Sequence, residues 1–368
     1  MLLDAMGIII ADNKRINLGE LINERALAAV PFAGRYRIID MILSSMVNSG
    51  IKHIGILAET KYSSLMDHIG TGSYWDLDRL QQGLRIIPPY TQSDFFKSQN
   101  PQDLRGLYDF LQRSVQQYVV ITESNLVANL DLSDCIKTHE KSDADITIVY
   151  NEDGKQSGSP IFSLVFDEEN TLTDLLFDAE NPPNNNSLGV CVMSRTLLVD
   201  ILAQSIARGD TAFSVEFLLN QYKELKIKGF KCTNIVLRIN SLATYFSSSM
   251  RLLDYDVRKC LFRSENKIYT KVKNEAPAKY FVGNSVSNSL ISDGCDISGT
   301  VKDSIIFRGV NVGKHCKIQN CIIMQDTQIM DGAELSNVII DKDTVIRAFV
   351  RLQGTAEHPV VIGKGVIV

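Results

Sequence analysis

The sequence predicts an α/β fold followed by a parallel β-helix, and two patterns carry this prediction. Through residues 6–150, short apolar runs alternate with stretches of helical periodicity, which is typical of a mostly parallel, doubly wound sheet. Toward the C-terminus, aliphatic residues instead recur about every six positions, which is typical of stacked hexapeptide coils. We therefore expect an α/β domain over residues 1–263, a linker over 264–279 and a β-helix over 280–368.

The first part of the chain supplies the elements of the predicted α/β domain. Apolar runs predict buried strands, and apolar residues spaced three or four apart predict helices. The predicted strands cover residues 6–11, 52–58, 83–88, 118–122 and 145–150, and the predicted helices cover 38 to near 50, 62–68, 104–115 and 132–139. The later part predicts strands over 162–166, 188–193 and 232–238, and helices over 196–207, 213–226 and 245–253. In such sheets ligands bind at the carboxyl ends of the strands.

The C-terminal repeat is built from aliphatic residues separated by Gly, Asn, Asp and Ser. Its members are Ile306, Val312, Ile318, Met324, Ile329, Leu335, Ile340, Ile346 and Leu352. A β-sandwich, the alternative, would show hairpins spaced about 8–12 residues apart with polar alternation. Some acyltransferases use hexapeptide coils catalytically, but they need a well-placed histidine, and neither His315 nor His358 has a motif around it. The repeat therefore favours an assembly surface.

Composition excludes several classes of protein. The formal net charge of −5 gives no basic footprint, so we expect neither nucleic acid nor membrane as a partner. The apolar run near the N-terminus reads as a first strand and not as a signal peptide. Seven cysteines without a CxxC motif and five scattered histidines predict reduced thiols, a cytoplasmic location and no zinc site.

The most specific stretch is residues 31–51, PFAGRYRIIDMILSSMVNSGI, in which a turn at Pro31 and Gly34 leads into a helix. It resembles the ADP-glucose pyrophosphorylase (glucose-1-phosphate adenylyltransferase) family, in which it reads PFGGKYRIIDFxLSNxxNSGI. The resemblance implies a Rossmann-like, GT-A-like nucleotidyltransferase domain and a left-handed β-helix, and so covers essentially the whole chain. Such an enzyme joins a sugar phosphate to ATP and releases pyrophosphate, with Mg²⁺, Lys and Arg neutralising the phosphate charge.

The phosphate-binding parts of this family are altered here. The family's loop LAGGRGTRL, whose glycines let backbone N–H groups approach the triphosphate, corresponds to IADNKRINL at residues 10–18, which has no glycine. Lys14 or Arg15 could still meet a phosphate. The lysine of the family's RAKPAVPF falls on Leu27, which cannot replace an ammonium group. The sugar-phosphate lysine of FVEKP falls near Asp178.

The metal ligands implied by the resemblance are altered as well. The first metal Asp, in LSGDHIYKMD, falls on Asn125 in TESNLVANLD, and an amide oxygen can ligate Mg²⁺ but lacks the negative charge. Glu123, two residues away, is the candidate replacement ligand, although its direction from the strand would differ. The second metal Asp, in WRDVGTIDAYWEANMDLL, falls on Arg238, with Asn240 nearby.

This pattern resembles the second, accessory subunits that accompany the catalytic subunit in some bacteria. It implies a subunit with little or no activity alone and no metal or cofactor of its own, since Mg²⁺ is needed only in the catalytic partner. The implied assembly is a heterotetramer with that partner. A phosphorylated small-molecule effector is a further expected ligand, with Arg35, Arg37, Lys61 and Arg85 as the basic residues available to line its site or a remnant substrate site.

Two other functions stay open from the sequence. The chain could be a competent glucose-1-phosphate adenylyltransferase with replacement ligands, which predicts Mg²⁺-dependent turnover by the chain alone. It could also be a scaffold protein unrelated to sugar nucleotides, which predicts no effect on a catalytic partner.

Overall fold

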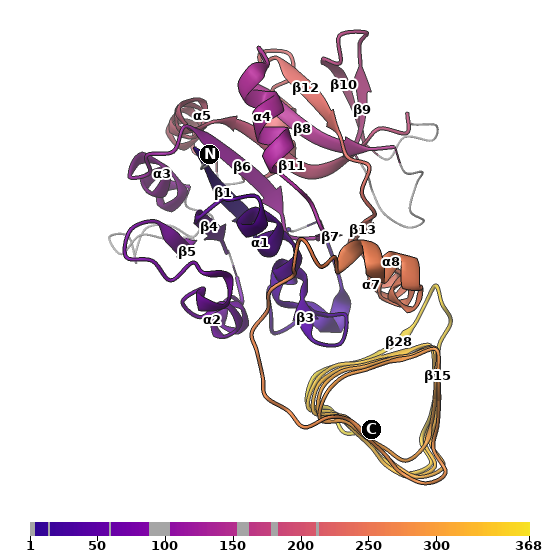
Figure 1. Ribbon diagram of the computed structural model, residues 1–368. Helices are drawn as coiled ribbons and strands as arrows, with labels where there is room; N and C mark the ends of the chain where they lie inside the picture. The colour runs from indigo at the N-terminus through magenta and orange to yellow at the C-terminus, as the bar shows by residue number, and fades with distance from the viewer. Residues whose placement is uncertain are drawn as a thin grey trace.

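The chain folds into an α/β part and a triangular β-helix that lies beneath it in Figure 1. The computed structural model describes residues 4–13, 15–58, 60–87, 104–152, 162–177, 183–210 and 213–368. Among these residues, no helix is long and apolar enough to cross a membrane.

The α/β part is organised around a nine-stranded sheet in which β10, β9, β11, β6, β1, β4 and β5 lie in that order. Strand β1 (Ala5–Ile10) is buried along its whole length and runs parallel to β4 (His53–Leu57) and β6 (Tyr118–Glu123). Strand β5 (Gly83–Ile87) pairs with β4 and forms one edge. Because both faces of these strands are covered by helices, they read as continuous apolar runs.

Helices cover both faces of this sheet. Buried residues of α1 (Ile38–Asn48) and α4 (Ser133–Lys141) join one core cluster with β1 and β4. Buried residues of α3 (Arg105–Gln112) and α5 (Arg195–Arg208) join a second cluster on the other face. The remaining helices are α2 (Ser63–Ile69), α6 (Val215–Leu219), α7 (Leu242–Met250) and α8 (Tyr255–Leu261).

The second half of the sheet is mixed, where the sequence predicts a mostly parallel sheet. Strand β11 (Asn186–Ser194) runs antiparallel to both β6 and β8 (Ile146–Asn151). Strands β9 (Phe162–Phe166) and β10 (Leu172–Phe177) form an antiparallel pair, and no strand is predicted over β10. Hydrophobic periodicity does not report strand direction, which depends on the pairing partner.

The predicted helix over 213–226 is wrong in its second half, because regular helix ends at Leu219. The predicted strand over 232–238 forms only in its last part, as β13 (Val236–Arg238), and β12 (Ile227–Lys231) precedes it where no element is predicted. Strand β12 pairs in parallel with β8, while β13 pairs with β7 (Leu126–Ala128). Residues 220–226 form turns that lead into β12, and the local apolar pattern does not report where the pairing of β12 with β8 begins.

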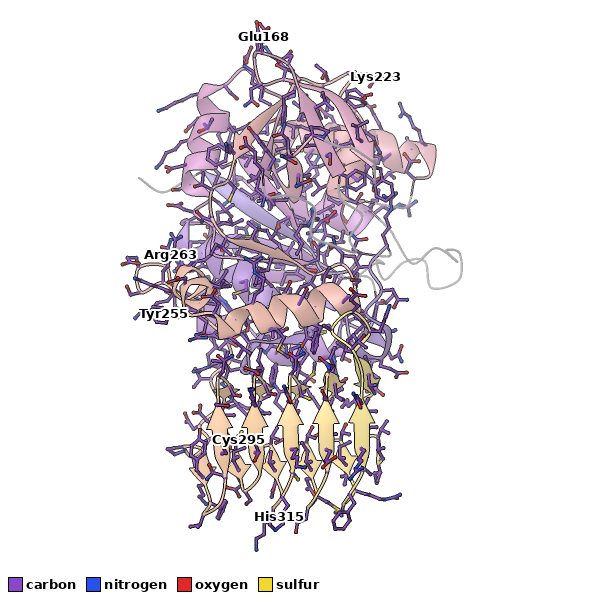
Figure 2. The ribbon with its side chains drawn as sticks, turned by 90° about the vertical axis from the view of Figure 1, so that its right-hand side faces the viewer. Glu168, Lys223, Tyr255, Arg263, Cys295 and His315 are labelled. Carbon is purple, nitrogen blue, oxygen red and sulfur yellow. The ribbon has the colours of Figure 1, made fainter. Side chains whose placement is uncertain are left out.

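The β-helix confirms the prediction from the six-residue repeat. Three five-stranded parallel sheets form its walls, and Figure 2 shows the coils side by side. Val301, Ile318 and Leu335 stack in register inside the prism, and all three are buried. The strands of successive coils are β14 (Lys279–Tyr280), β15 (Ser285–Ser287), β16 (Leu290–Ile291), β17 (Asp296–Ile297), β18 (Thr300–Lys302), β19 (Ile305–Ile306), β20 (Asn311–Val312), β21 (Lys317–Gln319), β22 (Ile322–Ile323), β23 (Gln328–Ile329), β24 (Glu334–Ser336), β25 (Val338–Ile340), β26 (Val345–Ile346), β27 (Arg351–Gln353) and β28 (Val360–Ile362).

The two parts share a hydrophobic core. The hairpin of β2 (Pro31–Phe32) and β3 (Tyr36–Arg37) packs with α7 and α8 onto one wall of the prism. Phe307, Ile322 and Ile339 are the buried β-helix residues at this contact. Between α8 and β14 the chain has no regular structure and is hydrogen-bonded to α1 through Ser44. The parts are therefore held by burial of apolar surface.

Helix α7 positions one strand end at the candidate site, and Ser241 caps it. The Ser241 hydroxyl accepts from the Thr244 amide at 3.1 Å, and the Thr244 hydroxyl accepts from the Ser241 amide at 2.8 Å. We expect Ser241→Ala to lower the free energy of unfolding by about 1 kcal/mol, since one helix N–H loses its acceptor. Urea denaturation measures this. Ser247→Ala, at an exposed position within the helix, is the control and should cost nothing.

Candidate functional site

The candidate site lies at the carboxyl ends of β1 and β6, where the loops after both strands meet. Glu123 is the last residue of β6, and the Ser124 hydroxyl donates to the carbonyl of Ala11, directly after β1, at 3.0 Å. Both neighbouring strands run in the same direction, so their following loops converge at one edge of the sheet.

An amide pair forms the floor of the site. Asn125 is almost fully buried, and its side-chain NH₂ donates to the side-chain oxygen of Asn240. The Ile239 amide donates to the Asn125 carbonyl at 2.9 Å and holds the end of β13 beside the β6–β7 turn. The residue beside Asn125 is therefore Asn240, whereas the sequence placed the second altered metal position on Arg238, two residues earlier.

Arg238 instead faces Glu123. Its Nη2 lies 3.8 Å from a carboxylate oxygen of Glu123, and its Nη1 donates to the Ser187 carbonyl. Burial raises the pKa of Glu123, and the charge of Arg238 opposes this shift. Burial lowers the pKa of Arg238, which Glu123 opposes in turn. The Glu123 carboxylate, two residues before Asn125, is thus engaged by a cation of the same chain.

These residues do not fit a magnesium ion. Mg²⁺ prefers carboxylate oxygens in octahedral geometry, usually with one or two protein carboxylates. The Asn125 side-chain oxygen has no hydrogen-bond partner among the described residues but carries no charge, and a guanidinium lies against Glu123, where it repels a dication. No group of three or more His, Cys, Asp or Glu side chains within the described ranges could hold a metal ion. We derive no step through a metal here.

The loop after β1 is occupied by side chains. Asn13 accepts from the Arg15 amide at 3.0 Å through its side-chain oxygen, and Asn17 accepts likewise from Gly19 at 2.8 Å. Arg15 reaches out to Glu216 on α6, with 2.6 Å between guanidinium and carboxylate. Side chains thus take the place at which the family's glycines would expose backbone N–H groups to phosphate.

Arg15 also closes this side of the site by stacking. Its guanidinium carbon lies 5.8 Å from the ring centre of Phe162 and 5.4 Å from that of Phe177. These rings, on β9 and β10, contact each other with centres 5.0 Å apart. An arginine that has a carboxylate partner and two aromatic faces is already satisfied without a phosphate.

The other altered positions have separate surroundings. Leu27 is 4% exposed and packs in the core between the two parts. Lys14 and Asp178, both named from the sequence, lie outside the described residues. Lys61 donates to the carbonyl of Ile22 at 2.9 Å. Arg85 lies in the middle of the edge strand β5 and away from this site.

A cationic cluster lies between the α/β part and the β-helix. Arg25 and Asp341 are paired at 2.9 Å, with side chains only 4% and 1% exposed. Arg37 donates to the Ser64 carbonyl and hydroxyl at 2.6 and 2.8 Å, and burial lowers its pKa to about 10. Burial lowers the pKa of Lys342 to about 7, and the charges of Arg37 and Arg25 lower it further, against Asp341.

Arg35 contributes to a neighbouring hollow and not to the Arg15 site. It stacks on Tyr36 at 5.7 Å and lines a cavity of about 550 Å³ together with Arg258 and Asp293. The structure therefore places Arg35 and Arg37 toward the β-helix and Arg15 at the sheet edge. Sequence analysis missed Arg25 and Lys342. Arg25 lies within the recognised RA–x–x–AV stretch, but nothing in the sequence marks Lys342, which only folding brings there.

A Lys342→Met variant is expected to be more stable than the native chain at pH 7, and the difference should shrink as pH rises. The folded chain holds the Lys342 proton less tightly than the unfolded chain, with a pKa of about 7 against the ordinary 10.5. Between these values the unfolded state binds more protons, so Lys342 adds stability to the native chain as pH rises through this window. Urea denaturation of both chains at several pH values tests this, with the exposed Lys279→Met as control.

Comparisons with known proteins identify the family of each part of the chain. Residues 8–159 match the nucleotidyl transferase family, and residues 276–357 match the GlmU-like C-terminal hexapeptide family. The chain is 35% identical to the glycogen biosynthesis protein GlgD of Bacillus subtilis, covering 98% of this chain and 96% of that protein. It is 36% identical to GlgD of Geobacillus stearothermophilus over 98% and 96% of the two chains.

A relative with a catalytic name is also similar over most of the chain. The glucose-1-phosphate adenylyltransferase of Clostridium perfringens strain 13 is 29% identical, covering 89% of this chain and 84% of that enzyme. The chain therefore belongs to the ADP-glucose pyrophosphorylase (glucose-1-phosphate adenylyltransferase) family, in the group of the glycogen biosynthesis protein GlgD.

Proposed function

We propose that this chain is a non-catalytic or weakly active regulatory subunit of ADP-glucose pyrophosphorylase in the bacterial cytoplasm. It modulates a catalytic paralogue that makes ADP-glucose from ATP and glucose 1-phosphate for glycogen biosynthesis. The names of its relatives support the pathway, and the altered site supports the absence of turnover.

The observation that carries the proposal is the amide pair at the floor of the site. In this family two carboxylates would hold the metal that neutralises the triphosphate, and Asn125 and Asn240 supply no charge for this. Arg238 beside Glu123 and Arg15 against Glu216 oppose a replacement arrangement. Magnesium is then a requirement of the partner's active site and not of this chain.

A regulatory subunit needs only to favour the partner's active conformation. A coupling free energy of about 1–3 kcal/mol between two sites changes affinity roughly 5–150-fold. The ends of the β-helix offer contact surface, because β14, β15 and β16 at one end and β27 and β28 at the other have no further strand beside them among the described residues. Val282 at one end is fully exposed, and Phe349 and Ile367 at the other are 78% and 59% exposed. These ends suit packing against other subunits in a heterotetramer.

The cationic cluster between the two parts suits a phosphorylated effector. The positive charges of Arg37 and Lys342 repel each other there, and the Asp341 carboxylate is already paired with Arg25. An anion would relieve this repulsion. Because the cluster contacts both parts of the chain, its occupancy can bias how they pack together.

Pyrophosphate release from ATP and glucose 1-phosphate with Mg²⁺ tests the proposal. The purified chain should release pyrophosphate at background rate, and its addition to the catalytic subunit of the same organism should raise that subunit's rate. Robust turnover by the chain alone would contradict the proposal and support an adenylyltransferase with replaced ligands. If the chain alone releases no pyrophosphate and the rate of the catalytic subunit is also unchanged by its addition, the result would support a scaffold unrelated to sugar nucleotides.

A further inference from the structure

A second cavity lies beside β5, the edge strand of the sheet, and away from the candidate site at the carboxyl ends of β1 and β6. It has a volume of about 640 Å³ and lies between the edge strand β5 and the C-terminal end of α3. His53 lines the cavity from the start of β4, and Arg85, Ile86 and Ile87 line it from β5, so the cavity runs along this edge strand. Its size is ordinary for a small-molecule site.

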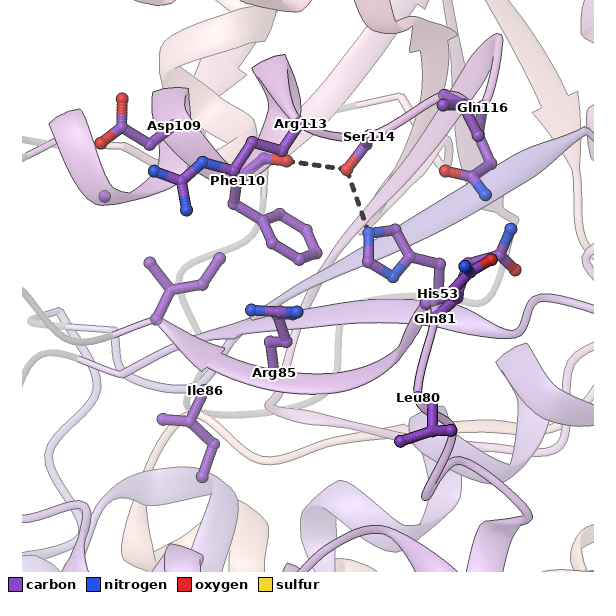
Figure 3. A pocket seen from close by; sticks show the side chains of 14 residues that line it. His53, Leu80, Gln81, Arg85, Ile86, Asp109, Phe110, Arg113, Ser114 and Gln116 are labelled. Atoms are coloured by element: carbon purple, nitrogen blue, oxygen red, sulfur yellow. Dashed lines mark hydrogen bonds between the residues drawn. The ribbon is translucent and has the colours of Figure 1, made fainter.

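Two guanidinium groups enter this cavity from opposite walls. Figure 3 shows Arg85 rising from β5 and Arg113 extending from the end of α3 toward the same space. Within the described ranges neither arginine side chain has an ion pair or hydrogen bond, although Asp109 also lines the cavity. Figure 3 shows the Asp109 carboxylate turned away from Arg85. Two like charges that face one hollow favour an anion between them.

The floor of the cavity is polar and buried. The Ser114 hydroxyl donates to the Phe110 carbonyl at 2.7 Å, so it accepts from Nε2–H of His53 at 3.0 Å. Burial lowers the pKa of His53, and the charge of Arg85 lowers it further, which favours a neutral ring. This hydrogen-bond pattern assigns the proton to Nε2 and leaves Nδ1 as an acceptor.

Two acceptors at this floor have no hydrogen-bond partner among the residues that the structure describes. They are Nδ1 of His53 and the side-chain oxygen of Gln116, on side chains 8% and 7% exposed. A buried acceptor without a donor is costly, so an occupant that brings hydroxyl groups gains from meeting them. Phe110, stacked on His53 with ring centres 4.7 Å apart, adds an apolar wall.

We propose that this cavity binds a small hydroxylated phosphate monoester. Its phosphate lies between Arg85 and Arg113, and its hydroxyl groups donate to His53 and Gln116. The site is separate from the cationic cluster between the two parts and does not depend on the regulatory role proposed above.

Calorimetric titration of the full-length chain with three probes tests the assignment. Glycerol 3-phosphate should bind, inorganic phosphate should bind at least tenfold more weakly, and glycerol alone should give no heat of binding. Equal affinity for the two phosphates would show that the floor acceptors take no part, and absence of binding at millimolar glycerol 3-phosphate would overturn the site.

Variants locate the bound probe. Arg85→Gln and Arg113→Gln should each weaken glycerol 3-phosphate binding at least tenfold, and both side chains are exposed, so the fold should persist. Gln116→Leu should lower the affinity for glycerol 3-phosphate and leave that for phosphate unchanged. Arg79→Gln, in the loop before β5, is the matched control and should bind normally. If Arg37→Gln abolishes binding while Arg85→Gln and Arg113→Gln do not, the probe binds in the cationic cluster and the proposal is wrong.

Discussion

An Arg25→Met variant is expected to lose about 3–5 kcal/mol of unfolding free energy. The guanidinium of Arg25 lies 2.9 Å from the Asp341 carboxylate across the contact between the two parts, and both side chains are buried. Removing the cation leaves Asp341 as a buried charge whose remaining contacts include the Lys342 amide at 2.8 Å. Urea or thermal denaturation measures the loss, and the free energy is determined separately for each unfolding transition that the chain shows.

The control for this prediction removes both charges. Arg25→Met combined with Asp341→Asn retains a side-chain oxygen for the Lys342 amide and leaves no uncompensated charge. It should therefore recover most of the lost stability, because replacing a buried ion pair as a whole is often nearly neutral. If the double variant is as unstable as Arg25→Met, then packing of the arginine side chain, and not its charge, stabilises this contact.

The second large effect is expected from Asn125→Asp combined with Asn240→Asp. The two side chains are in direct contact and buried, so two carboxylates there would repel and one pKa would rise. We expect a loss of about 3–4 kcal/mol without divalent cations, from a rise of roughly two to three pKa units. Mg²⁺ should then raise the melting temperature of this variant and not that of the native chain.

Turnover should nevertheless stay at background in this double variant. Leu27 is buried in the core and cannot supply an ammonium group, and Arg15 remains bound to Glu216 in the loop without glycines. Pyrophosphate release with Mg²⁺, ATP and glucose 1-phosphate is the measurement. Substantial release would show that the metal ligands alone were missing. Asn311→Asp, at an exposed position of the β-helix, controls for the change in charge.

Much of the fold follows from local patterns. The apolar run of β1 and the helical spacing in α1 are short-range properties that survive in any packing, and both elements lie where they are expected. The β-helix repeat is equally local, because every coil needs the same inward aliphatic residues. Strand β12 was not predicted, since it is a short, mostly half-buried strand that forms through its pairing with the distant β8.

The candidate site also has features that the sequence predicts and features that depend on strand pairing. Loss of the glycines before Leu18, of the lysine at Leu27 and of the carboxylate at Asn125 is a matter of residue identity, and the sequence establishes it. Which residue lies beside Asn125 depends on the register between β7 and β13, and only the structure shows Asn240 there. A shift of two residues in an alignment is invisible without that pairing.

The sequence by itself determined the family, the repeat and which of the family's phosphate-binding and metal-binding residues this chain lacks. Tertiary structure decided where the remaining charges go: Arg15 onto Glu216 and two phenylalanines, Arg238 onto Glu123, and Arg25 onto Asp341. The physical reason is that a long charged side chain is neutralised by whichever partner folding brings within reach, and sequence distance does not report that partner.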